Sequence, residues 1–260
     1  MAQCLADQDM ERWSMSTARK EIGKAIQSIA HRHGAWRVFT DFVEMGALAI
    51  SNAVDKPQYD KREERYMQIV KSYNPDELKR FPEMLGMLTA GLEDEATDIL
   101  GPVFHDLELH NKWAGQFFSP MPICQLMAAM TLGTELAEKM VGRGFIRAQE
   151  PASGSGAMAI ALALEMKRAG FNYQQQLHMT AVDVDAKCAH MTYLQLSLLH
   201  IPAVVVHGNT LTLEEYGHWY TPAHIFGGWG LKLRRGDGPK REPIIAPPEA
   251  PVTLGQLSLF

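Results

Sequence analysis

One short stretch of the chain combines residue types that bind ligands, the heptapeptide Glu-Pro-Ala-Ser-Gly-Ser-Gly at residues 150–156. The apolar run 145–148 before it predicts a strand, and the Ala-, Leu- and Met-rich run 157–168 after it predicts a helix closed by Gly170. In this setting glycines let the backbone approach a ligand, and the helix N-terminus offers free N–H groups. Glu150 is unfavourable beside a phosphate but suits a ligand with a positively charged amino group. These residues favour S-adenosylmethionine over a nucleotide.

Two further predicted strands end in polar residues that suit the same ligand. The pattern at 178–184 predicts a strand that ends near Asp183, and 203–206 predicts a strand that leads to Asn209. A carboxylate there can accept hydrogen bonds from both ribose hydroxyls, and an amide can reach the edge of an adenine ring. Because helices alternate with these strands, their ends should meet at one edge of an open α/β sheet. His207 is a candidate base at this edge, and a merely half-exposed histidine is the favoured alternative.

An aromatic pair precedes these elements, in Gly-Gln-Phe-Phe-Ser-Pro at residues 115–120. Two adjacent aromatic side chains cannot both point inward from a regular element, so one of them is expected to line a cleft. Ser119 predicts the N-cap and Pro120 the first residue of a helix that continues through 121–131. The residues alone leave two roles open, ligand binding and loop packing.

Residues 9–112 predict helices, with no strand alternation of useful length. The expected helices cover 10–33, 35–54, 61–73 and 98–111, and Asn74 begins another that Pro82 limits or kinks. We interpret the histidines and tryptophans of this region as helix-end and core residues rather than as a site.

The length, net charge and cysteine content of the chain narrow the classes of protein to which it could belong. The 260 residues suffice for one large domain or two small ones, and the net charge of −5 predicts no global basic field for nucleic acids. The three cysteines lack metal-ligand spacing, so we expect no metal site, and their odd number suits a reducing cytoplasm. No stretch has the apolar length of a membrane span, and the N-terminus lacks a signal-peptide pattern. We expect a cytoplasmic protein with a helical region at 1–112, a cofactor domain at 113–231 and a tail at 232–260.

From about residue 98 to residue 211, the chain resembles the modification subunit of type I restriction–modification systems, and adenine-N6 DNA methyltransferases in general. Residues 115–120 are similar to the family's first cofactor motif and 150–156 to its Asp-Pro-Ala-Cys-Gly-Ser-Gly signature, while 181–185 and 207–211 match the next two motifs in order. The resemblance implies an α/β, Rossmann-like S-adenosylmethionine-dependent methyltransferase fold behind a helical N-terminal region. The cofactor residues that it implies are Gln116, Phe117, Phe118, Ser119, Pro120, Glu150, Ala152, Gly154, Gly156, Asp183, Val184, Asn209 and Thr210.

Within this set, the resemblance implies distinct roles. Residues 117–120 pack around the methionine part of the cofactor, and Glu150 binds its amino group. Asp183 binds the ribose, and Asn209 lies near the adenine. The resemblance also implies DNA as the substrate and a specificity subunit as a partner.

The chain departs from the family at the catalytic motif. The family uses Asn/Asp-Pro-Pro-Tyr/Phe to hold the amino group of the target adenine and to stack on the flipped base, and this chain has no such tetrapeptide. The segment at the corresponding distance, 220–224, keeps one proline, so the candidates for catalysis are Thr221, Pro222 and His224. The chain also ends before the remaining three strands of a full sheet, so we expect a fold shortened in its C-terminal half.

Two functions follow from these observations. One is an adenine-N6 DNA methyltransferase that acts with a partner subunit, and the other is a degenerate methyltransferase that acts as a binding protein on DNA. The missing motif favours the second, and the match over the whole module favours the first. Trp219, Tyr220 and Trp229 either stack on a base or cover a truncated sheet edge.

The tail carries a basic cluster and a terminal motif. Lys232, Arg234, Arg235, Lys240 and Arg241 are expected to contact DNA phosphates, with a solvated linker as the alternative. A proline-rich, extended stretch then leads to a pentapeptide that resembles the bacterial sliding-clamp binding motif without departure, Gln256, Leu257, Ser258, Leu259 and Phe260. The alternative is a C-terminal segment that docks on the chain's own core.

Overall fold

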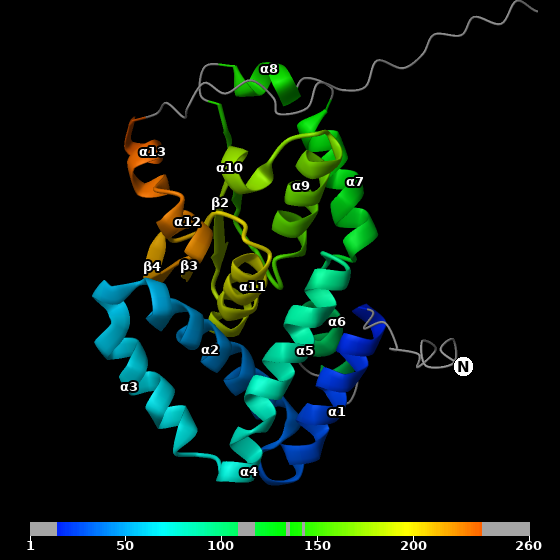
Figure 1. The fold of residues 1–260 in the computed structure, drawn as a ribbon, viewed down its shortest axis with the longest axis vertical. Coiled ribbons are helices and arrows are strands. Elements are labelled where there is room, and N and C mark those ends of the chain that lie inside the picture. Colours follow the sequence, from blue (N-terminus) through cyan, green and yellow to red (C-terminus); the bar gives the residue numbers. More distant parts are fainter. Residues whose placement is uncertain (1–14, 109–117, 134–135, 142–143, 236–260) are drawn as a thin grey trace, which may run out of the picture.

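The computed structural model describes residues 15–108, 118–133, 136–141 and 144–235. Its N-terminal part consists of helices, in the lower half of Figure 1, and its C-terminal part contains a sheet with flanking helices, in the upper half. The predicted α/β fold with a helical N-terminal region is confirmed. The N-terminal elements are α1 (Met15–His33), α2 (Ala35–Val54), the 3-10 helix η1 (Lys56–Gln58), α3 (Tyr59–Val70), α4 (Pro75–Leu78), α5 (Arg80–Asp94) and α6 (Leu100–Glu108).

Local chemistry sets the helix boundaries around residue 74. Asn74 caps α4 as predicted: its side chain accepts hydrogen bonds from the N–H groups of Asp76 and Glu77, and the Glu77 carboxylate accepts one from the Asn74 N–H. Of the two effects predicted for Pro82, the structure agrees with a limit rather than a kink, because α4 ends at Leu78 and Pro82 lies in the first turn of α5. A proline is tolerated there because the first N–H groups of a helix have no intrahelical partner.

Within the described residues, the sheet has four strands in the order β1-β2-β3-β4. The strands β1 (Ile146–Glu150), β2 (Leu177–Asp183) and β3 (Ala203–Asn209) are parallel neighbours, and β4 (Glu214–Tyr220) runs antiparallel beside β3. Helices α9 (Ala157–Arg168) and α11 (Ala186–Leu198) lie between the parallel strands in the chain, so this unit is Rossmann-like. The carboxyl ends of the three parallel strands therefore share one edge of the sheet, the carboxyl edge.

The remaining helices surround this unit. They are α7 (Met121–Leu132), α8 (Leu136–Met140), α10 (Tyr173–Gln176), α12 (Pro222–Phe226) and α13 (Trp229–Arg235). Among the helices that the structure describes, none is both long enough and apolar enough to span a membrane.

Strand β4 is not predicted from the sequence. Its first three residues are exposed and Trp219 is its one buried residue. An antiparallel edge strand contacts the core mainly through one face, so its sequence need not be apolar throughout. Because β4 is antiparallel to β3, it carries the chain from the carboxyl edge back to the opposite edge.

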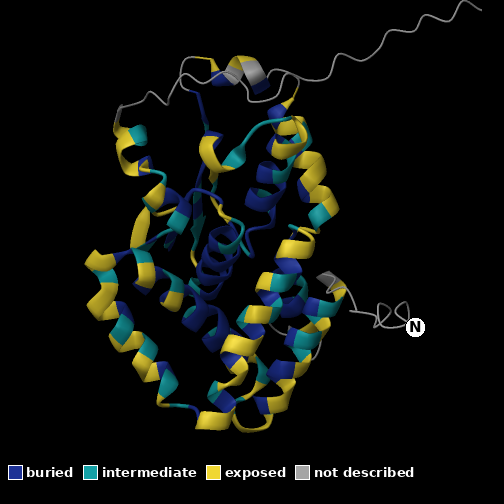
Figure 2. Ribbon diagram, in the orientation of Figure 1, coloured by how far each residue is buried: buried dark blue, intermediate teal, exposed yellow. Residues whose placement is uncertain are grey.

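The helical part and the sheet share a single core. Helix α11 is buried from Lys187 to Ser197, and α2 packs against it. The two helices approach so closely that a Cβ atom on Gly46 would lie 3.0 Å from the Leu194 side chain. A continuous set of buried apolar residues runs through both parts, along the dark blue segments of Figure 2. The helical part is therefore packed onto the sheet rather than tethered to it.

Trp219 and Trp229 belong to this packing. The ring of Trp229, fully buried in α13, lies edge-on to Phe145 and 5.2 Å from the ring of His178. Trp219 is 8% exposed, and the guanidinium of Arg62 lies 4.0 Å from its ring centre. These contacts support the interpretation that both tryptophans cover the sheet rather than stack on a base.

Candidate functional site

The loop between β1 and α9 contains two glycines in the left-handed region, Gly154 with φ 56° and Gly156 with φ 96°. Residues with a side chain rarely adopt these backbone angles, so glycine is needed at both positions. The Ser153 N–H fixes the loop to the sheet by donating to the Val182 carbonyl oxygen at 2.9 Å. Gly156 is the N-cap of α9, so the loop leads directly into the helix. The predicted succession of strand, glycine turn and helix is confirmed.

Asp183 lies at the end of β2 and contacts this loop. Its Oδ2 accepts a hydrogen bond from the Gly154 N–H at 2.8 Å, and its Oδ1 accepts one from the Asp185 N–H at 2.9 Å. Burial raises the pKa of Asp183, although these two backbone hydrogen bonds act in the opposite direction. Each carboxylate oxygen has a second lone pair, so Asp183 can still accept hydrogen bonds from a ligand.

Glu150 lies at the end of the neighbouring strand β1. It accepts a hydrogen bond from the Ala152 N–H at 3.2 Å. Burial raises the pKa of Glu150, and the negative charge of Asp183 raises it further. Two half-buried carboxylates at one edge of the sheet create a place where a positively charged group is stabilising. The prediction that Glu150 and Asp183 meet at one edge is confirmed by the pairing of β1 with β2.

Asn209 and Thr210 follow the third parallel strand at the same edge. The Asn209 Oδ1 accepts hydrogen bonds from the Leu211 N–H at 2.9 Å and the Thr212 N–H at 3.3 Å, so it closes its own turn. The Thr210 hydroxyl donates to the Pro151 carbonyl oxygen at 2.6 Å and ties this turn to the glycine loop. With its oxygen engaged in the turn, Asn209 keeps its NH2 group as a hydrogen-bond donor.

The residues before α7 contribute one aromatic contact to the loop. A Cβ atom on Gly154 would lie 2.8 Å from the ring of Phe118, so this ring rests directly on the glycine. The Phe118 N–H donates to His105 Nε2 at 3.1 Å, and the Phe104 ring centre is 5.0 Å away. Phe118 is thus half-buried between α6 and the loop, while Gln116 and Phe117 lie outside the described residues.

The expected helix cap before α7 is wrong. The N-cap of α7 is Pro120, with no side-chain hydrogen bond, and not Ser119. The helix begins at Met121, one residue later than expected. The Pro120 carbonyl oxygen accepts hydrogen bonds from the N–H groups of Ile123 and Cys124. The side chain of proline has no hydrogen-bond acceptor, so Pro120 cannot cap the helix through its side chain. Both Ser119 and Pro120 are exposed.

The structure adds two buried charged residues that the sequence does not single out. Asp98, immediately before α6, accepts a hydrogen bond from the hydroxyl of Ser155 in the glycine loop at 2.6 Å. The Lys187 ammonium lies 3.7 Å from the ring centre of Trp36 and forms an ion pair with Asp185 at 3.4 Å. Their contacts join distant parts of the chain, and the sequence carries no spacing signal that would reveal them. Val184, between Asp183 and Asp185, is 60% exposed.

The catalytic candidates lie at the opposite edge of the sheet. The Thr221 hydroxyl accepts from the Ala203 N–H at 2.9 Å and contacts the Ile201 carbonyl oxygen at 2.9 Å, at the start of β3. His224, which follows Pro222 in α12, has its Nδ1 2.8 Å from Nε2 of His178, the second residue of β2.

His178 is five residues from Asp183 along β2, which corresponds to about 17 Å at the usual rise of a strand. Burial, with His224 and Arg147 as lesser causes, lowers the pKa of His178 to about 3. The two histidines are therefore a neutral, buried pair. The structure does not bring Thr221, Pro222 or His224 together with the glycine loop.

The tail is described only as far as Arg235, the last residue of α13. The Lys232 ammonium lies 4.5 Å from the ring centre of Trp229, and Arg234 is exposed. Lys240, Arg241 and the terminal pentapeptide 256–260 lie outside the described residues, so the DNA-binding and clamp-binding interpretations stay predictions.

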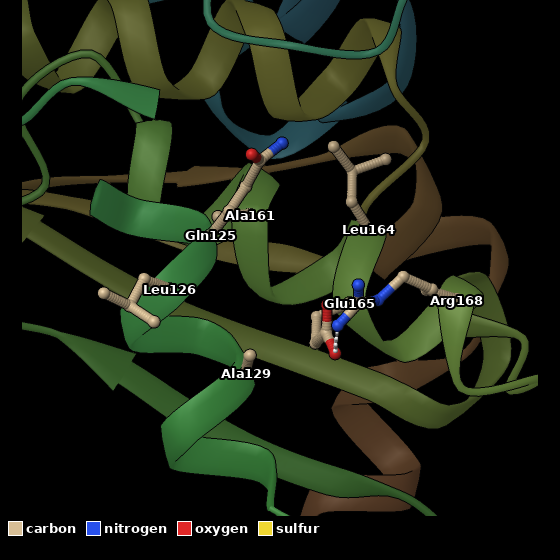
Figure 3. A pocket seen from close by; sticks show the side chains of 7 residues that line it. All are labelled: Gln125, Leu126, Ala129, Ala161, Leu164, Glu165 and Arg168. Carbon is tan, nitrogen blue, oxygen red and sulfur yellow. Dashed lines mark hydrogen bonds and ion pairs between the residues drawn. The ribbon is translucent and has the colours of Figure 1, made fainter. Parts of the chain in front are cut away.

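A separate cavity of about 370 Å³ lies between α7 and α9 (Figure 3). Its charged lining residues, Glu165 and Arg168, form an ion pair with each other at 2.8 Å. The other lining residues are Gln125, Leu126, Ala129, Ala161 and Leu164. Because its charges are paired, this cavity offers less to an ionic ligand than the carboxyl edge does.

The chain has low similarity to known proteins, in both sequence and structure. No family model matches the chain, and no curated protein matches it. A structure from Listeria monocytogenes, described as a class I S-adenosylmethionine-dependent methyltransferase, has a TM-score of 0.42 and 14% identity, over 81% of this chain and 69% of that one. The type I restriction–modification system methyltransferase subunit from Streptococcus thermophilus has a TM-score of 0.35 and 10% identity, over 72% of this chain and 56% of that one. Similarity at these levels assigns no function.

Proposed function

We propose that the chain binds S-adenosylmethionine at the carboxyl edge and serves as the cofactor-binding part of an adenine-N6 DNA methyltransferase. The observation that carries the proposal is the pair of half-buried carboxylates, Glu150 and Asp183, on either side of a left-handed glycine loop. This arrangement favours a ligand that carries a positive charge and several hydrogen-bond donors. S-adenosylmethionine has both, in its ammonium and sulfonium groups and its ribose hydroxyls.

Each of these residues has a proposed role in binding the cofactor that agrees with its contacts. Glu150 binds the amino group, and Asp183 accepts from the ribose hydroxyls with its remaining lone pairs. Asn209 donates to a nitrogen at the edge of the adenine, since its carbonyl oxygen already closes the turn. Phe118 forms an apolar wall against Gly154.

In this proposal, a partner subunit supplies the groups that hold the target adenine, which accepts the methyl group. Transfer to an adenine amino group needs a hydrogen-bonding group that holds that amine close to the methyl group. The carboxylates at the carboxyl edge are committed to the cofactor in this proposal, while Thr221 and His224 hold the opposite edge of the sheet. DNA specificity would then also come from a partner, such as a specificity subunit.

The alternative function is a binding protein without catalysis, recruited to DNA through the terminal pentapeptide. The feature that favours it is the separation of Thr221, Pro222 and His224 from the glycine loop. Methyl transfer from labelled S-adenosylmethionine to DNA, measured with and without partner subunits, separates the two functions. Label in DNA supports the enzyme, and its persistent absence despite cofactor binding supports the binding protein.

The first test of the proposal is calorimetry with S-adenosylmethionine, S-adenosylhomocysteine and methylthioadenosine. We expect both amino-acid-bearing ligands to bind, and methylthioadenosine, which lacks the amino group, to bind about tenfold more weakly or worse because it cannot pair with Glu150. As the pH falls through the raised pKa values of Glu150 and Asp183, both carboxylates become neutral. Affinity for S-adenosylmethionine should therefore fall toward acid pH more steeply than affinity for methylthioadenosine. Absence of binding by all three ligands at neutral pH would contradict the proposal.

The second test addresses the terminal pentapeptide. Deletion of residues 256–260 is expected to abolish retention of the chain on an immobilised bacterial sliding clamp, because the motif supplies the apolar groups for the clamp pocket. Phe260→Ala should have nearly the same effect. Ser258→Ala is the matched control and should retain most binding, since that position of the motif accepts both serine and aspartate. Equal retention of all variants and the full chain would reject the motif.

A further inference from the structure

We propose that Asp98 and Gln195 are positioning residues through which the helical N-terminal part holds the glycine loop in its ligand-binding conformation. The inference rests on the proposed function and extends it, because it makes the helical part a component of the cofactor site.

The first contact set is centred on Asp98, which is 5% exposed. Its Oδ2 accepts from the Ser155 hydroxyl at 2.6 Å, and its Oδ1 accepts from the Gly101 N–H and from Gln195 Nε2, each at 2.9 Å. Ser155 and Gln195 are 57 and 97 residues away in sequence. A buried carboxylate that accepts several hydrogen bonds is held strongly in place.

The second contact set is centred on Gln195, which is fully buried in α11. Its Oε1 accepts from the N–H groups of Ile99 at 2.9 Å and Leu100 at 3.2 Å, where α6 begins. Its Nε2 donates to the Ser155 carbonyl oxygen at 2.8 Å as well as to Asp98. One amide side chain thus connects the start of α6, the glycine loop and α11.

The attachment point lies inside the glycine loop itself. Ser155 stands between Gly154 and Gly156, the two left-handed residues, and is 1% exposed. Both its hydroxyl and its carbonyl are bound by the network. Because the flanking glycines restrict the backbone little by themselves, the conformation of the loop depends on outside contacts, among them these two. A ligand at the carboxyl edge meets Gly154 and Asp183, while the network acts from behind.

Gly101 offers a way to disturb the network by a substitution outside the loop. A Cβ atom there would lie 2.2 Å from Asp98 Oδ2 and 2.8 Å from Ser155 Oγ. Alanine otherwise favours a helix more than glycine does. Gly86 in α5 is the matched control, because a Cβ atom there meets nothing within 4 Å.

The experiment compares Gly101→Ala, Ser155→Ala and Gly86→Ala with the unmodified chain. The measurements are the Kd for S-adenosylmethionine by calorimetry, amide hydrogen exchange at residues 153–156 without ligand, and Tm. We expect Gly101→Ala to weaken binding about tenfold or more and Ser155→Ala by several-fold, as the loss of hydrogen bonds to a charged group implies. Both should speed exchange in the loop. Gly86→Ala should change neither property and should keep or raise Tm.

The outcomes separate positioning from a purely structural role. A lowered Tm with unchanged affinity and unchanged loop exchange in both Gly101→Ala and Ser155→Ala would overturn the proposal. If Gly101→Ala does not fold, Ser155→Ala decides, because it removes one hydroxyl and adds no atoms. If the unmodified chain binds no S-adenosylmethionine, the proposed function fails, and the exchange rates at 153–156 alone decide whether Asp98 and Gln195 position the loop.

Discussion

Asp183→Ala is expected to weaken binding of S-adenosylmethionine by about 100-fold or more, the loss that follows from removing several hydrogen bonds to one carboxylate. The substitution deletes the acceptor proposed for the ribose. It also frees the Gly154 and Asp185 N–H groups, which the two carboxylate oxygens hold at 2.8 and 2.9 Å. Calorimetry measures the Kd, and circular dichroism confirms that the variant is folded.

Asp183→Asn is the matched control for this experiment. It keeps the size of the side chain and one acceptor, but its NH2 group must face one of the two N–H groups. We expect an affinity between those of the unmodified chain and Asp183→Ala. A folded Asp183→Ala variant that binds S-adenosylmethionine as tightly as the unmodified chain would remove Asp183 from the site.

Trp229→Ala is expected to lower the free energy of unfolding by about 3–5 kcal/mol, the usual loss for a buried tryptophan. Trp229 is fully buried, its ring edge-on to Phe145 and beside His178. Removing it opens a cavity where α13 covers the start of β1 and β2. Urea denaturation followed by circular dichroism measures the change.

Trp229→Phe separates packing from any polar role of the indole. The indole nitrogen is buried without a hydrogen-bond partner among the described residues, so its loss costs nothing in hydrogen bonding. We expect Trp229→Phe to lose clearly less stability than Trp229→Ala. If Trp229→Ala kept full stability but lost binding to DNA, the tryptophan would instead be a base-stacking residue.

The elements that the sequence predicts well are those with a local cause. Helix α9 follows from an unbroken Ala-, Leu- and Met-rich run, and α4 follows from Asn74 as its cap. The parallel strands β2 and β3 follow from apolar runs that end in polar residues. Since parallel strands in such a unit place their carboxyl ends together, the meeting of Glu150 and Asp183 could be predicted as well.

The features that the sequence does not predict depend on contacts between distant residues. Strand β4 exists because β3 offers it an edge, and its own residues are largely polar. The position of His224 follows from the direction of β4, which distance along the chain does not reveal. Asp98 looks like an ordinary residue at a helix start, and its role appears only when Ser155 and Gln195 are folded against it.

The antiparallel return of β4 also determines where the described part of the chain ends. After Tyr220 the backbone is at the edge of the sheet opposite the carboxyl edge, where Trp229 packs on Phe145. The last described residue, Arg235, is six positions after Trp229. The glycine loop and Asp183 lie at the other end of the strands, at the carboxyl edge. A tether fixed to the end of α13, whether a sensor surface or a neighbouring protein, would therefore attach on the side of the sheet opposite the glycine loop.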